Sequence, residues 1–599
     1  MKKIAISILF GILFTITLIY VPTSPILNLE MLKVSINGYG VFFTISALAI
    51  AYAFNKLVFE SKYKIKFNIH ILLTSLFLAF CSLIGKYYIH SLGLQDLYSS
   101  LSVVIINVLF YAIYFISFYI GILNLFEFCN SYEEKEFEVK SKFSKVLDFV
   151  LNKHSFIIPF LIILICGIPY IVAFFPGTVQ DDGNVQLQQF LGNYDKTSHH
   201  PYVSTIVLGT CFKIGSSIGN DNLGIFVYTM LQFLISSLVF AYSIDYMKKI
   251  EAPIVLRFIT LICFSVFTIW PINAYTFVKD TMYYLIFLLI VIHVYKYVTD
   301  EKVQSKISFN IEFALLCILL CMFRSNGIEV VIISILSLLF LNKNKKRIIM
   351  LALVLVSIII YNSIIQPFIY KKVALIEGSI REALSVPIQQ ISLTIVKHGD
   401  EIDKEDREFI EKIQNLSFDE IKEGYIPEMS DPIKNKFEYE PTDEELSHYF
   451  KIWFKYLLRH PISYVDAYLN NFYGYFYPDR TEYKDGLGWY LCHATEQVDV
   501  HFNPDFEGQR NNIEQFAYFL RNVPIIGIFY STGIYTWFLI IIFSYLMYNK
   551  KYKYLLILVP SILSLVVCCL SPVGAYIRYS QPIMANMPLL LCLLFNKKA

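Results

Sequence analysis

The chain has 599 residues, of which 56% are hydrophobic and only 16% are charged. A water-soluble protein of this length could not bury so much apolar surface, because hydrophobic cores stop growing and long chains divide into domains. The formal net charge of +2 gives no overall field that favours nucleic acid, and we expect no nucleic-acid partner. The composition therefore indicates an integral membrane protein.

Long apolar runs separate short polar loops, and many of these runs approach the roughly 20 residues that cross a bilayer as a helix. The pattern does not resemble the short alternating segments of transmembrane barrels. We therefore predict an all-α polytopic membrane protein with about fourteen spans. The predicted spans are residues 4–21, 38–58, 67–87, 101–127, 156–175, 222–246, 253–273, 281–297, 308–323, 327–341, 347–367, 525–548, 554–570 and 577–595.

Lysine and arginine residues cluster in alternate loops between these spans, for example in residues 56–66, 135–153 and 343–347. The positive-inside rule then predicts that both chain termini are cytoplasmic and that the protein is a multi-pass protein of the cell membrane. This orientation requires that residues 201–217, which contain Lys213 and small polar residues, do not cross the bilayer. We predict an interfacial helix there.

The spans divide the chain into four regions. Two long segments, residues 176–221 and 368–524, are predicted to lie outside the cytoplasm, and the second has the composition of a folded polar domain. Thr442 and Glu445 have the spacing of a capping box, which predicts a helix over residues 443–459 and a mainly helical domain. The regions are 1–154 with four spans, 155–367 as a membrane core, 368–524 as the polar domain, and 525–599 with three spans.

The segment after the fifth predicted span carries Thr178, Asp181 and Asp182, followed by Gln186 and Gly192. Thr178 and Asp181 also have capping-box spacing, which predicts a helix that begins at Thr178 and stops at Gly192. Asp181 would then serve as a cap. Asp182 would share a helix face with Gln186, which makes it the better candidate for a reactive carboxylate. A solvated acidic turn is the alternative.

His199 and His200 follow, immediately before Pro201. Adjacent side chains point in different directions in regular structure, so we do not expect both histidines to face one site. Each could have a purely structural role. Either histidine could also join Asp182 in binding a divalent metal ion, although the sequence has no Cys/His spacing typical of a metal site.

Three cations lie at the predicted outer ends of separate spans: Lys279, Arg324 and Arg578. Ionisable residues in such positions are costly and are often functional. Arginine binds two phosphate oxygens at once, so the three side chains together could bind an anionic headgroup. The alternative for each residue is ordinary snorkelling of a long side chain towards the membrane interface.

The order of these motifs resembles the GT-C superfamily, membrane glycosyltransferases that use polyprenyl-phosphate sugars. The resemblance rests on an acidic pair in the loop, a His-Pro pair before the interfacial helix, and a short Gly/Asn turn. These are Asp181-Asp182, His200-Pro201 and residues 219–222. Residues 175–178, 323–327, 381–390 and 473–478 also resemble an uncharacterised family of bacterial multi-spanning membrane proteins that is placed near these enzymes.

The resemblance implies a GT-C-like helical bundle that transfers a sugar from a polyprenyl-phosphate donor to an envelope glycan or lipid acceptor. The reaction would be inverting and would occur on the extracytoplasmic face, with the donor held in the lipid bilayer. Asp182 would act as general base with Asp181 as the second acidic residue of the motif. Substrate-binding positions would be Gln186, His199, His200, Lys279, Arg324 and Arg578.

Two other classes of function remain open from the sequence. A transporter or flippase for an envelope lipid or a lipid-linked glycan would need the same cations but no general base. Transporters often show inverted repeats, and we find none in this sequence. A non-catalytic scaffold for envelope assembly is the third class.

Overall fold

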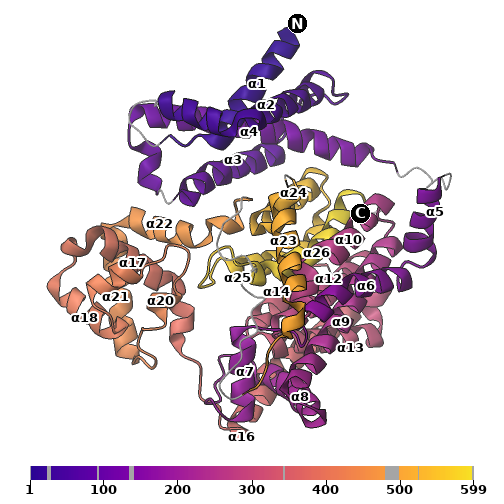
Figure 1. The fold of residues 1–599 in the computed structure, drawn as a ribbon, viewed down its shortest axis with the longest axis vertical. Coiled ribbons are helices and arrows are strands. Elements are labelled where there is room, and N and C mark those ends of the chain that lie inside the picture. Colours follow the sequence, from indigo (N-terminus) through magenta and orange to yellow (C-terminus); the bar gives the residue numbers. More distant parts are fainter. Residues whose placement is uncertain are drawn as a thin grey trace.

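The computed structural model describes residues 2–22, 29–90, 93–133, 141–341, 344–478, 498–523 and 525–596. These residues are helical almost throughout (Figure 1). Within them, the only sheet consists of two short parallel strands, β1 (Thr178–Val179) and β2 (Thr276–Phe277). The predicted all-α class is therefore confirmed.

Within the described residues, seven helical segments are long and apolar enough to cross a membrane. Residues 142–153 and α6 (Ile157–Ala173) add an eighth if the two, bent by 106°, form one span. Helices without internal breaks suit this role because lipid offers no partners for backbone amides. The seven are α1 (Lys2–Ile19), residues 40–59 (the end of α2, Leu29–Phe54, and the π-helical turn after it), α3 (Ile69–Ile89), α4 (Leu101–Ser131), α9 (Asp221–Lys249), α12 (Asp280–Thr299) and residues 345–372.

Shorter apolar helices occupy most of the other predicted spans. They are α10 (Ile254–Val266), α13 (Ile307–Phe323), α14 (Gly327–Leu339), α24 (Thr532–Tyr548) and α25 (Leu555–Cys568), and the more polar α26 (Ile577–Leu591) follows them. The helix predicted for residues 201–217 is present as α8 (Tyr202–Ile218) and packs on α9. The chain is thus a membrane-embedded protein with several long apolar helices.

Helix α12 is the most enclosed of the long apolar helices. In its apolar stretch, 83% of the residues are buried within the protein, against 22% for α1 and 28% for α4. It packs against α9, α13, α25 and α26. Asp280 is the first residue of α12, and its side chain is buried at this end of the helix.

The polar domain contains α17 (Ser385–His398), α18 (Lys404–Gln414), α19 (Phe418–Gly424), α20 (Asp431–Lys434), α21 (Asp443–Arg459) and α22 (Pro461–Phe472). These helices lie beside the membrane bundle (Figure 1) and enclose their own apolar core. The predicted capping box is confirmed, because Thr442 Oγ1 accepts a hydrogen bond from the Glu445 amide at 3.2 Å. Residues 479–497 of the predicted domain lie outside the described residues.

Backbone hydrogen bonds attach the polar domain to the membrane bundle at two places. The amide of Ser198 donates to the Ile376 carbonyl at 2.8 Å, next to the two histidines. The amide of Ser430 donates to the Pro572 carbonyl at 2.9 Å, in the loop that precedes α26. The domain is therefore fixed on both sides of the space between itself and the bundle.

A third attachment joins the polar domain to the N-terminal region through Asp466 of α22. Its carboxylate is fully buried and accepts hydrogen bonds from the Tyr88 hydroxyl at 2.8 Å and the Leu94 amide at 2.9 Å. Lys397 of α17 supplies a compensating cation at 2.8 Å. One carboxylate thus connects three segments that are far apart in the sequence.

Candidate functional site

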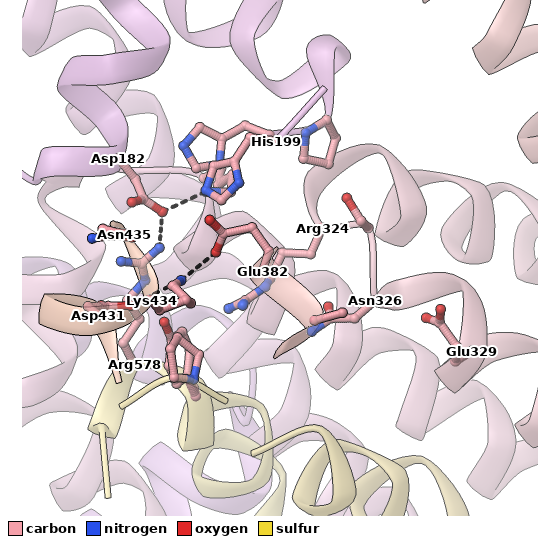
Figure 2. Close-up of a pocket in the computed structure, with 17 residues that line it drawn as sticks. Asp182, His199, Arg324, Asn326, Glu329, Glu382, Asp431, Lys434, Asn435 and Arg578 are labelled. Carbon is pink, nitrogen blue, oxygen red and sulfur yellow. Dashed lines mark hydrogen bonds and ion pairs between the residues drawn. The ribbon is translucent and has the colours of Figure 1, made fainter. Parts of the chain in front are cut away.

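A cavity of about 680 Å³ lies between the membrane bundle and the polar domain (Figure 2). This volume is within the usual range for small-molecule sites. Six of the eight predicted site residues line it, and the exceptions are Asp181 and Gln186. The six are Asp182, His199, His200, Lys279, Arg324 and Arg578.

The short sheet explains how two of these residues meet. β1 and β2 pair in parallel, with Thr178 opposite Thr276, so the chain segments that follow both strands emerge side by side. One leads to Asp182 and the other to Lys279. Gly183 makes the close approach possible, because a Cβ atom there would lie 2.0 Å from the Phe277 carbonyl oxygen.

The same pairing overturns the predicted start of the helix. The Thr178 amide donates to the Tyr275 carbonyl, and its hydroxyl bonds to Thr276 at 2.7 Å, so Thr178 is a strand residue and not a cap. Helix α7 (Asp181–Leu191) begins later and has no side-chain cap. The predicted stop is confirmed, since Gly192 adopts the left-handed conformation with φ 84°. Asp181 is the first helical residue and is exposed.

Asp182 lies between two cations. Its Oδ2 atom is 2.9 Å from Lys279 Nζ and also forms an ion pair with Arg578. Although burial opposes ionisation, Arg578 and Lys279 hold the pKa of Asp182 well below its ordinary value. The side chain is therefore a carboxylate at neutral pH, and with 26% of its surface exposed it remains accessible from the cavity.

Asp280 extends this ion pair into a chain. Its Oδ1 atom accepts from Arg324 Nη1 at 2.7 Å, and its Oδ2 atom accepts from Arg578 Nε at 3.0 Å. Five alternating charges result, in the order Lys279, Asp182, Arg578, Asp280 and Arg324. The cations point inwards, with only 5% to 19% of their side chains exposed, so the snorkelling interpretation does not describe them.

Both histidines line the cavity, which contradicts the expectation that only one would face it. The expectation assumed regular structure, whereas residues 193–201 lie outside any helix or strand. The two rings are 4.5 Å apart. Burial lowers the pKa of both imidazoles, and Lys279 lowers that of His200 further, so both are neutral at pH 7. Together with Asp182 they do not bring three ligand atoms within 4.8 Å of one another.

Gln186 does not line the cavity but packs against α8. Its side chain is fully buried, and its amide donates to Ser204 Oγ at 2.8 Å and to Thr205 Oγ1 at 2.9 Å. These bonds hold α7 against α8. The amide thus helps to orient the helix that carries Asp182.

The polar domain contributes residues to the cavity that the sequence did not suggest. Lys434 of α20 is buried and forms ion pairs with Glu382 and with Asp431, the latter at 3.0 Å. All three side chains line the cavity, together with Asn435. The only sequence signal was the segment 381–390, which contains Glu382 and belongs to the resemblance to the uncharacterised family.

The sequence model of DUF6020, described as a family of unknown function, matches residues 195–599. The chain belongs to this family. Comparison with curated proteins and with solved structures finds no match. The part of this DUF6020 protein that matches includes the two histidines, Lys279, Arg324 and Arg578, and it begins after Asp182. Of the two carboxylates in the ion chain, Asp280 lies within the matched region, whereas Asp182 comes from the segment that precedes it.

Proposed function

We propose that this DUF6020 protein is a membrane glycosyltransferase. It would move a sugar from a polyprenyl-phosphate donor to a cell-envelope acceptor, with inversion at the anomeric carbon. The observation that carries the proposal is the ionised Asp182, which reaches a cavity of about 680 Å³ while paired with Lys279 and Arg578. A base candidate and phosphate-binding cations are thus in direct contact.

The charges that line the cavity suit a donor with one anionic group and many hydroxyls. Lys279, Arg324 and Arg578 lie on the side of the membrane bundle, where charge-assisted hydrogen bonds would bind the phosphate. Glu382 and Asp431 lie on the side of the polar domain, where carboxylates would accept hydrogen bonds from sugar hydroxyls. A ligand with several phosphates would be repelled by these carboxylates.

The reaction would be a single displacement. Asp182 takes the proton of an acceptor hydroxyl while that oxygen attacks the anomeric carbon. The bond between the anomeric carbon and the phosphate oxygen breaks, and its electron pair leaves with the polyprenyl phosphate. Arg324, Arg578 and Lys279 stabilise the charge that develops on the departing phosphate.

Donor binding would also activate the base. Without a donor, Asp182 is a weak base because Arg578 and Lys279 hold its pKa well below the ordinary value. A phosphate that accepts hydrogen bonds from the same cations would weaken their hold on the carboxylate. The pKa of Asp182 would then rise towards the range in which a carboxylate accepts a proton efficiently.

The proposal includes a topology of about fourteen spans with both termini in the cytoplasm. The GT-C-like core, the cavity and the polar domain would then face the extracytoplasmic side. Nucleotide sugars are absent there, so an activated sugar has to arrive on a membrane lipid. The shorter helices would cross together with the seven long ones, and α8 would lie at the interface.

Cysteine labelling of intact cells tests this topology. In a background with Cys492 changed to serine, we expect a membrane-impermeant maleimide to modify Lys436→Cys in the polar domain. The same reagent should leave Lys346→Cys unmodified until the cells are permeabilised, because the basic loop near it is predicted to be cytoplasmic. Both positions are exposed, so access depends on sidedness. Labelling in the reverse sense would rule out the topology and the mechanism.

Removal of a cation should weaken donor binding. We expect Arg324→Ala to raise the Kd for a polyprenyl-phosphate sugar about 10–100-fold, because it removes charge-assisted hydrogen bonds. Arg324→Lys should restore little, since a lysine cannot bind two oxygens in a fork. Arg578→Ala should weaken binding similarly, but it also leaves Asp182 and Asp280 with fewer cations.

The matched control is Arg407→Ala, an exposed arginine of α18 that pairs with a surface glutamate. Binding of fluorescent donor analogues to purified protein gives the affinities, and thermal unfolding reports whether each variant is folded. Wild-type affinity in both Arg324→Ala and Arg578→Ala would show that these cations do not bind the phosphate.

The decisive test of the function is mass spectrometry of envelope glycans from wild-type and deletion cells. We expect the deletion to remove one sugar from an envelope glycan or lipid, and the wild-type gene to restore it. Restoration by an Asp182→Asn gene would favour a transporter, which needs the cations but no base. Identical glycans in both strains would contradict the proposal.

A further inference from the structure

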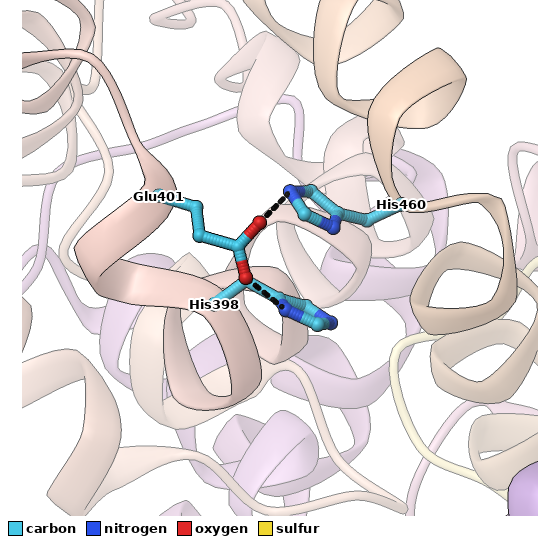
Figure 3. Close-up of side chains that lie close together, drawn as sticks. All are labelled: His398, Glu401 and His460. Atoms are coloured by element: carbon cyan, nitrogen blue, oxygen red, sulfur yellow. Dashed lines mark hydrogen bonds and ion pairs between the residues drawn. The ribbon is translucent and has the colours of Figure 1, made fainter.

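Three potential metal ligands converge in the polar domain, outside the residues that line the cavity (Figure 3). His398 ends α17, and Glu401 lies in the helical turn that follows it. His460 lies in the junction between α21 and α22. The glutamate carboxylate lies beside both imidazoles, with one oxygen facing each ring, so the fold brings together two segments that are far apart in the sequence.

The distances are close to those of a metal site. His398 Nδ1 is 3.0 Å from Glu401 Oε1, and His460 Nε2 is 3.7 Å from Glu401 Oε2. All three residues offer ligand atoms that lie within 4.8 Å of one another. Tetrahedral zinc, with bonds of about 2.0–2.1 Å, places its ligand atoms roughly 3.3 Å apart. The three residues are therefore close enough to share one ion once their side chains are reoriented.

The two imidazole rings are stacked, with centroids 4.1 Å apart and planes 15° apart. A single ion cannot lie in the planes of two stacked rings. At least one ring therefore has to turn about its Cβ–Cγ bond when a metal binds. This torsion is broad in histidine, so the rearrangement requires no change in the backbone.

His460 gives an independent indication of a ligand. Its side chain is 10% exposed, yet its Nε2 atom has no hydrogen-bond partner among the described residues. Buried polar atoms in native structures almost always have one, and an exception calls for a missing ion or water. The atom is directed towards Glu401, whose side chain is 63% exposed and leaves the site open to solvent (Figure 3).

We propose that His398, Glu401 and His460 bind Zn²⁺. Two imidazoles and one carboxylate are typical zinc ligands, and the exposed side of the site leaves the fourth position for water. The ion would join the end of α17 to the junction of α21 and α22. Lys397, next to His398, pairs with Asp466, so the zinc would stabilise the part of the domain that contacts the N-terminal region.

Isothermal titration of metal-free protein in detergent with ZnCl₂ tests the site. We expect wild type to bind one equivalent, and His398→Ala and His460→Ala to bind at least about tenfold more weakly. Zinc should also raise the Tm of wild type but not of these variants, because an ion that binds the folded state stabilises it. His448→Ala, an exposed histidine of the same domain, should behave as wild type.

Glu401→Gln separates loss of the ligand from loss of folding. Its side chain is largely exposed, so the metal-free variant should unfold at the wild-type temperature and still lose zinc binding. Zinc binding that persists in both histidine variants would place the ion elsewhere and overturn the proposal. Absence of stoichiometric binding to wild type would overturn it equally.

Discussion

Asp182→Asn is expected to slow sugar transfer by about 10²–10⁴-fold, the usual effect of losing a general base. An asparagine keeps the size of the side chain and can still accept hydrogen bonds from Lys279 and Arg578, but it cannot take a proton. Arg578 also keeps its contacts with Asp280. Donor binding and thermal stability should therefore change much less than the transfer rate, measured with purified protein and a polyprenyl-phosphate sugar.

Asp181→Asn is the matched control for this variant. The neighbouring carboxylate is exposed at the first position of α7 and does not line the cavity, so most activity should remain. If Asp181→Asn were inactive and Asp182→Asn active, the general base would be Asp181 and not Asp182. Full activity in both variants would rule out the proposed glycosyltransferase mechanism.

Asp466→Ala should lower the free energy of unfolding by several kcal/mol, because each buried donor that is left without an acceptor costs about 1–3 kcal/mol. The change leaves Lys397 without its anionic partner and removes the acceptor of the Tyr88 hydroxyl and the Leu94 amide. Thermal unfolding in detergent should show a large fall in Tm. The Tm of Asp466→Asn should fall less, because an asparagine keeps an acceptor for the two neutral donors.

Asp403→Ala is the control for this stability effect. Asp403 also forms ion pairs, with Lys455 and Arg459, but its side chain is 49% exposed. Solvent and salt screen such surface pairs, so its Tm should stay close to that of wild type. Equal values of Tm for Asp466→Ala and wild type would show that the junction between the polar domain and the N-terminal region contributes little.

The sequence alone was sufficient to predict the features that depend on local patterns. Apolar runs predicted the membrane-embedded helical class, and the capping box at Thr442 predicted the first turn of α21. The same pattern failed at Thr178, because pairing with Thr276 uses the backbone and hydroxyl groups that a cap would need. A local signal is overridden where a distant segment offers the same groups better partners.

The partners within the cavity could not be predicted in this way. Asp280 is adjacent to Lys279 in the sequence, yet it forms hydrogen bonds with Arg324, which follows α13, and with Arg578 of α26. Lys434 and Glu382 come from the polar domain, and their spacing in the chain carries no information about the bundle. The expectation for the histidine pair failed because it relied on the geometry of regular structure, which residues 193–201 do not have.

The cavity has two walls with different origins. The ion chain belongs to the helical bundle and to the segments that follow the two-stranded sheet, whereas Glu382, Asp431 and Lys434 belong to a domain with its own core. Replacement of residues around α20 can therefore alter the second wall while the geometry of the first is preserved. Under the proposed function, recognition of the sugar and binding of the phosphate would be separable by engineering, so a variant library confined to residues 426–435 is where a change of the transferred sugar should be sought.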